Sequence, residues 1–126
     1  MKRDVEGRDE LHQILRDFYE LLMDDENLSP FFKKFRDQQV LTQHLHDLVE
    51  FWDGALFYSG NYGKNVMDIH RKIHLTRPIS NLHVDSWINL FEAAVDSNFT
   101  GEVADTLKNR ARSIATVMKI KFSREN

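Results

Sequence analysis

The sequence predicts an all-α protein, and three observations favour this fold class. Apolar residues recur every three or four positions over four long stretches, which places them on one face of a helix. No stretch alternates apolar and polar residues as a half-buried strand does. Short segments with glycine, proline or acidic residues separate the stretches, and no internal repeat is visible. The 126 residues, 41% of them hydrophobic, suit a single domain over residues 1–126.

The first expected helix covers residues 8–24 and leads into a corner rich in phenylalanine. The apolar face of this helix consists of Leu11, Ile14, Leu15, Phe18 and Leu22. The segment DDENLSPFF then breaks the helical spacing. Ser29 followed by Pro30 is expected to cap a short helical turn, because serine is a common N-cap and proline is tolerated in a first turn. This turn carries Phe31, Phe32 and Phe35.

Four further helices are expected along the rest of the chain. The second long helix ends near Tyr58, and its apolar face holds Leu41, Leu45, Leu48, Val49, Trp52, Ala55 and Leu56. A shorter helix over residues 65–75 carries His70 on an otherwise apolar face and ends before Pro78. Gly101 separates the last two helices. Their apolar residues are Val84, Trp87, Ile88, Phe91, Ala94 and Val95, then Val103, Leu107, Ala111, Ile114, Met118 and Phe122.

Composition excludes several classes of function. A net charge of -3 and a pI near 6.0 do not provide the basic surface that nucleic-acid binding requires, so no nucleic-acid partner is expected. The chain has no cysteine, which excludes disulfides, thiolate zinc sites, iron–sulfur clusters and a cysteine nucleophile. The charged first twenty residues do not resemble a signal peptide, and no stretch has the length of an apolar membrane span. We therefore expect a cytoplasmic protein with no membrane partner.

Histidines are the first candidates for chemistry. His70 lies on an apolar helix face, where it is either a core histidine hydrogen-bonded to a carbonyl or a metal ligand. His74 lies one turn later, so the two could chelate zinc, but Arg71 stands where an HExxH site has its glutamate. His12 and His83 have polar neighbours in the sequence and are expected to be solvated.

Other polar or aromatic side chains are expected to face the interior. Tyr19 lies on the inner half of the first helix, where its hydroxyl needs a partner or a polar cavity. His44 lies one turn before Leu48 on the inward face of the second long helix, which leaves His46 toward the surface. No phosphate-binding glycine loop, serine–histidine–acid set or carboxylate pair stands out. Two tryptophans on apolar faces are more typical of packing than of a site: Trp52 and Trp87.

Four segments, taken in order, resemble the truncated haemoglobins, in particular the third group found in bacteria. LRDFYELLMDDENLSPFF is similar to the first helix and phenylalanine corner of that family, and TQHLHDLVEFWDGALFYSGNY to its distal helix. NVMDIHRKIHL is similar to the segment with the proximal histidine, and SWINLFEAAVDSNFTGE to the helix with a distal tryptophan. The resemblance covers nearly the whole chain. It implies a shortened globin fold, a two-over-two helical sandwich around haem.

The same resemblance implies a role for individual residues. His70 corresponds to the iron ligand, because Met67 lies three residues before it as in the family; His74 remains a rival ligand. The open side of the haem is expected to meet Tyr19, His44 and Trp87. Further contacts with the cofactor are expected from Phe32, Leu48, Trp52 and Met67. At three positions this chain departs from residues frequent in the family, so contacts to the haem carboxylates are not implied: Val66, Val84 and Ser86.

The implied function is binding of small diatomic ligands at a five-coordinate haem iron. The haem is expected to be haem b, since a chain without cysteine cannot form thioether links. The expected ligands are dioxygen, nitric oxide and carbon monoxide. Three donors around dioxygen favour tight binding, which suits a nitric-oxide dioxygenase or peroxidase-like enzyme with a reductase partner. Oxygen transport or sensing without turnover is the alternative, and a haem-free interaction or zinc-binding domain is a remote one.

Overall fold

A computed structural model describes residues 2–57 and 79–125, with side chains to residue 121. Its elements are α1 (Arg8–Asp24), the 3-10 helix η1 (Ser29–Arg36), α2 (Gln38–Phe57), α4 (Asn81–Asp96) and α5 (Glu102–Glu125). Within the described residues the only extended pairing is an isolated bridge between Arg3 and Phe99. The predicted all-α class is confirmed. The expected helix over residues 65–75, with His70, lies outside the described residues.

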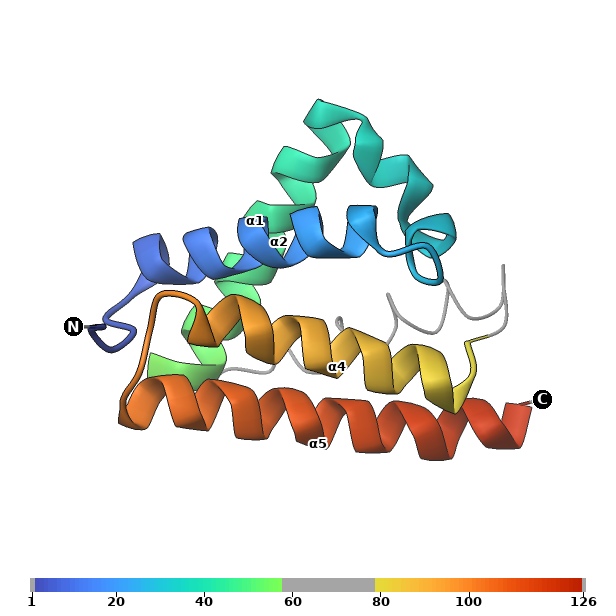
Figure 1. The fold of residues 1–126 in the computed structure, drawn as a ribbon. Coiled ribbons are helices and arrows are strands. Elements are labelled where there is room, and N and C mark those ends of the chain that lie inside the picture. The colour runs from blue at the N-terminus through green and yellow to red at the C-terminus, as the bar shows by residue number, and fades with distance from the viewer. Residues whose placement is uncertain (1, 58–78, 126) are drawn as a thin grey trace.

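The helices form two packed pairs. α1 packs on α2, α4 packs along α5, and α1 also lies against α4, which joins the two pairs. Figure 1 shows α4 and α5 running antiparallel side by side, while α2 crosses α1. This arrangement agrees with the predicted two-over-two sandwich. Among the described helices, none is both long and apolar enough to cross a membrane.

The core lies where the apolar faces predicted from the sequence meet. Every residue named for the face of α1 is at most 2% exposed. Aromatic rings continue this core from α2 to α4, because Trp52 stacks on Phe91 at 5.7 Å and Phe91 stacks on Trp87 at 6.1 Å. Full burial of one large apolar side chain stabilises a fold by about 1.5–3 kcal/mol, so this core holds the sandwich together.

The corner after α1 differs from the sequence prediction in its cap. η1 begins at Ser29 with Pro30 in its first turn, as expected, but Leu28 occupies the N-cap position and there is no side-chain cap. Instead, the Asp25 carboxylate accepts hydrogen bonds from the backbone N–H groups of Asn27 and Leu28 at 2.9 and 3.0 Å. The prediction of a Ser29 cap was therefore wrong. An aspartate that bonds to the backbone two residues later stabilises the turn itself.

Residues 2–5, which we call the N-terminal clip, hold the start of α5. The Arg3 carbonyl accepts from the Thr100 N–H at 3.0 Å, beside the Arg3–Phe99 bridge. One oxygen of Asp4 accepts from Ala104 N–H at 2.8 Å and the other from Val103 N–H at 2.9 Å. Asp4 is thus an N-cap for α5 from about one hundred residues earlier in the chain.

The electrostatics of Asp4 follow from these contacts. Desolvation alone would raise the pKa of its carboxyl group, but the N–H groups of Val103, Ala104 and Val5 lower the pKa below its usual value. Gly101 makes room for the carboxylate: its φ is +137°, and a Cβ built there would lie 2.5 Å from Asp4 Cγ. A glycine is needed here for both conformation and space.

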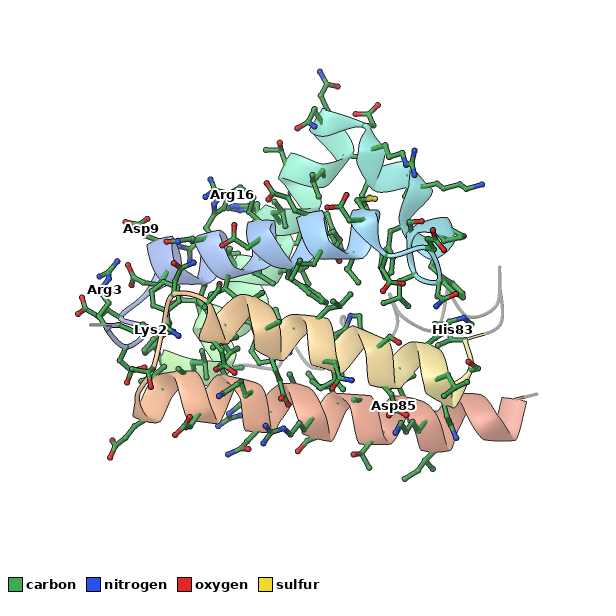
Figure 2. The ribbon with its side chains drawn as sticks, viewed as in Figure 1. Lys2, Arg3, Asp9, Arg16, His83 and Asp85 are labelled. Carbon is green, nitrogen blue, oxygen red and sulfur yellow. The ribbon has the colours of Figure 1, made fainter. Side chains whose placement is uncertain are left out.

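Among the side chains that the structure describes, three ion pairs join the exposed sides of α4 and α5. Lys108 Nζ lies 2.8 Å from Asp96 Oδ1. The other two pairs are Arg112 with Glu92 and Lys119 with Asp85, and Figure 2 shows Asp85 between these two helices. The acidic partner lies on α4 each time, and the three pairs follow the antiparallel register.

Candidate functional site

An apolar cavity lies between η1, α4 and α5. Its walls consist almost entirely of aromatic and aliphatic side chains. Among the described residues, those that line it are Leu28, Phe31, Phe32, Ile79, His83, Val84, Trp87 and Met118. Concave apolar surfaces with a few polar groups are the usual form of a small-molecule or cofactor site. We take this cavity as the candidate site.

Tyr19 and His44 form a hydrogen-bonded pair beside this cavity. The Tyr19 hydroxyl lies 2.5 Å from His44 Nε2, which joins the inner faces of α1 and α2. The rings of Phe32 and Phe35 contact Tyr19 edge-on with centroids at 5.9 and 5.6 Å, and Phe35 also stacks on His44 at 4.2 Å. Phe32 lines the cavity as well, so only one ring separates the tyrosine from the cavity along this path.

The pair can hold its protons in two ways. The Tyr19 O–H donates to Nε2 when His44 carries its proton on Nδ1; with a proton on Nε2, the imidazole donates to the phenol oxygen instead. Burial raises the pKa of the Tyr19 hydroxyl above its usual range, so the phenol keeps its proton near neutral pH. The second arrangement therefore leaves the Tyr19 O–H able to donate to another acceptor.

This pairing answers one question that the sequence left open and confirms two expectations. The sequence analysis left the partner of Tyr19 open between a side chain and a polar cavity, and the structure supplies His44. His44 faces inward and His46 is exposed, as expected. Helical spacing predicts that each side chain faces the core, but not that residues 25 apart on different helices meet.

Trp87 lies directly on the cavity wall. Its side chain is 9% exposed, and its ring contacts Phe18 edge-on at 5.8 Å. Phe18 also contacts Tyr19 edge-on at 5.6 Å. One phenylalanine therefore packs against both the indole and the phenol, which fixes their relative position through the rigid core of α1.

His83 is a cavity residue that the sequence analysis placed in solvent. It is half-buried, lines the cavity and contacts the Phe31 ring at 4.8 Å. It also caps α4 together with Ser80: Ser80 Oγ accepts from the His83 N–H, and His83 Nδ1 accepts from the Ser80 N–H. The usual capping box has glutamate or glutamine at this position, so the sequence of this chain does not show the pattern by which a capping box is recognised. The expectation of a solvated His83 is therefore correct only in part, because one side of its ring lies against the cavity.

The other predicted site residues are distributed differently. Phe32 lines the cavity. Leu48 and Trp52 are buried in the core at 8% and 4% exposure, and neither is among the described lining residues. His70 and Met67 lie outside the described residues. Within the described residues, no group of three or more histidine, aspartate or glutamate side chains could hold a metal ion.

Comparisons with known proteins agree with this fold. The family model of bacterial-like globins matches residues 3–122. The group 3 truncated hemoglobin ctb of Campylobacter jejuni subsp. jejuni serotype O:2 is 23% identical over 118 residues, which are 92% of this chain and 91% of that protein. The crystal structure of group III truncated hemoglobin from Campylobacter jejuni superimposes with a TM-score of 0.83 at 22% identity, over 97% of this chain and 95% of that one. The chain belongs to the bacterial-like globin family.

Proposed function

We propose that this globin binds haem b in the cavity and that His70 is the axial ligand of its iron. A globin is a haem protein for small ligands, and the aromatic side chains of Phe31, Phe32 and Trp87 on the cavity wall are of the kind that packs against a flat apolar ring. The chain has no cysteine for a covalent attachment. When bound, the haem supplies an iron site for a diatomic gas and its redox chemistry.

We propose further that the polar side chains beside the cavity serve as donors to that gas. The observation that carries this proposal is the buried Tyr19–His44 pair, 2.5 Å between Oη and Nε2, one ring away from the cavity. Trp87 adds an indole N–H from the cavity wall. Donors fixed in an apolar surrounding stabilise a polarised acceptor more than they would in water.

These donors favour redox chemistry on nitric oxide or peroxide over transport. A carrier must release dioxygen readily, whereas several preorganised donors retain it. His44 can also exchange a proton with Tyr19, so the pair can hold a proton next to the reacting gas. Turnover of this kind requires electrons from a reductase.

Absorption spectra of the ferric, ferrous and carbon-monoxide forms test the first proposal. We expect a haem spectrum that His70→Ala alters in the ferrous and carbon-monoxide forms, while His74→Ala, the matched control one turn away, leaves it nearly unchanged. A well-folded protein that refuses added hemin would contradict the proposal. Loss of haem binding in His74→Ala alone would move the ligand by one helical turn.

Turnover tests the preference for redox chemistry. Reduced protein in air-saturated buffer is mixed with nitric oxide, and nitrate is measured in the presence of a chemical reductant. We expect more than one nitrate per haem, and fewer in Tyr19→Phe. Fast release of dioxygen without nitrate formation would support a carrier or a sensor instead.

A further inference from the structure

His83 is half-buried and lines the cavity, so it lies where the cavity meets solvent. Figure 2 shows it at the start of α4, on the side that faces η1, where its ring contacts Phe31. Apart from the Trp87 indole N–H, the described lining offers no other polar side-chain group. This makes the imidazole the main polar feature of the rim.

The α4 cap determines which nitrogen of His83 carries the proton. The backbone N–H of Ser80 donates to Nδ1 at 3.0 Å, and an N–H donor requires a lone pair on its acceptor. In the neutral ring the proton is then on Nε2. The cap thus makes Nε2–H a donor and prevents this nitrogen from being a metal ligand in that state.

This Nε2–H has no acceptor in the described part of the chain, where the recorded hydrogen bonds of the ring all involve Nδ1. A donor at the edge of an apolar cavity gains most from an anionic acceptor that remains partly in water. A carboxylate attached to an apolar ligand has this chemistry. Haem carries two carboxylate side chains on one edge of an apolar ring.

We propose that His83 donates a hydrogen bond from Nε2–H to a carboxylate of the haem at the rim of the cavity. This inference rests on the proposed haem binding. It assigns to His83 two linked tasks: the Nδ1 side caps α4, and that contact orients the opposite nitrogen toward the ligand.

Two substitutions separate these tasks. Glutamine and glutamate are both natural partners in a capping box, so His83→Gln and His83→Glu each retain an oxygen that accepts from the Ser80 N–H. The glutamine amide also keeps a donor for the carboxylate. The glutamate side chain has no donor and repels it. His12→Glu, at an exposed position of α1, controls for the added charge.

The experiment measures haem loss to an excess of a haem-scavenging apoprotein, followed at the Soret band. We expect His83→Glu to lose iron protoporphyrin IX at least ~10-fold faster than wild type, since bonds to charged groups are strong, and His83→Gln to stay within about 3-fold. The same proteins are then loaded with the dimethyl ester of iron protoporphyrin IX, which has no carboxylate charge. With the ester, the difference between wild type and His83→Glu should disappear.

Thermal unfolding of the haem-free proteins shows whether the cap is intact, and both variants should unfold close to wild type. Equal haem loss in the two variants, or an unchanged difference with the ester, would overturn the role of His83. Failure of wild type to take up either porphyrin would instead overturn the proposed function. The two failures are therefore distinguishable.

Discussion

The two ends of α5 use polar groups in opposite ways. At its first turn, near the N-terminus in Figure 1, the N-terminal clip brings Asp4 onto Val103 and Ala104. Toward its other end, Met118 is part of the cavity wall, with His83 across from it on α4. Both ends cap a helix, Asp4 for α5 and the Ser80–His83 pair for α4.

The difference lies in what remains after capping. Both oxygens of Asp4 accept hydrogen bonds from backbone N–H groups of its own chain, so this carboxylate is engaged in holding the start of α5. At the cavity end, the Nε2–H of His83 has no acceptor among residues 2–57 and 79–121, and the Tyr19–His44 pair can shift its shared proton. Saturated polar groups indicate a structural role, and groups with spare capacity indicate a binding role. Substitutions at the clip should therefore change the free energy of unfolding, and substitutions at the cavity end should change the binding of ligands.

The largest effect is expected from Tyr19→Phe at the cavity end. Loss of a hydrogen bond to a strongly polarised acceptor costs ~1.5–3 kcal/mol, which is a ~10- to 100-fold change in an equilibrium constant. Dioxygen should dissociate faster by about this factor in stopped-flow experiments. Carbon monoxide is less polarised and should respond less. An unchanged dioxygen rate would contradict the donor role of Tyr19.

Trp87→Phe should change the dioxygen rate in the same direction by less. The Tyr19→Phe/Trp87→Phe double variant tests redundancy: an effect larger than the sum of the single variants would show that the donors replace each other. A substitution in the N-terminal clip should leave the dioxygen dissociation rate unchanged, because no residue of the clip is among the described residues that line the cavity.

The helices were predictable because local spacing determines them. The face of α1 has five apolar residues at helical intervals, and the helix begins and ends where this pattern does. Contacts between distant residues were not predictable, since Asp4 reaches α5 about one hundred residues away and Tyr19 meets His44 on another helix. The capping role of His83 was not predicted, because a histidine stands where a capping box usually has glutamate or glutamine. Sequence periodicity reports which face a residue occupies and not its partner.

At the clip, Gly101→Ala should lower the free energy of unfolding by about 1–3 kcal/mol. The new Cβ would meet the Asp4 carboxylate at 2.5 Å, and a φ of +137° is strained for alanine. Gly7→Ala is the matched control, because nothing lies within 4 Å of its Cβ position and its φ is extended. Chemical denaturation measures both. A smaller loss for Gly101→Ala than for Gly7→Ala would show that the clip does not constrain this corner.

Asp4→Asn should lower the free energy of unfolding by about 1 kcal/mol, since one amide oxygen cannot replace two acceptor oxygens. The pKa of Asp4 is lowered in the folded state, so its carboxylate stabilises the fold above the unfolded pKa near 3.8, and this contribution is lost as the pH falls through the folded pKa. The gap between wild type and Asp4→Asn should therefore be full at neutral pH and close in acid. Asp24→Asn, at an exposed position, should show no such gap.

The smallest effect is expected between the two ends, along the α4–α5 ion pairs. Lys108 lies 2.8 Å from Asp96, and this hydrogen bond raises the pKa of the lysine, but the Asp96 side chain is 55% exposed. Exposed pairs contribute about 0.2–1 kcal/mol and weaken with salt. Lys108→Gln should thus lower the free energy of unfolding by about 0.5 kcal/mol at low salt and by less in 1 M salt. Arg110→Gln is the control, since Arg110 is exposed on the same helix and forms no ion pair within the described part of the chain. A loss of the same size at low and at high salt would contradict this interpretation, because it would mean that Lys108 stabilises the contact of α4 with α5 through its apolar stem and not through its charge.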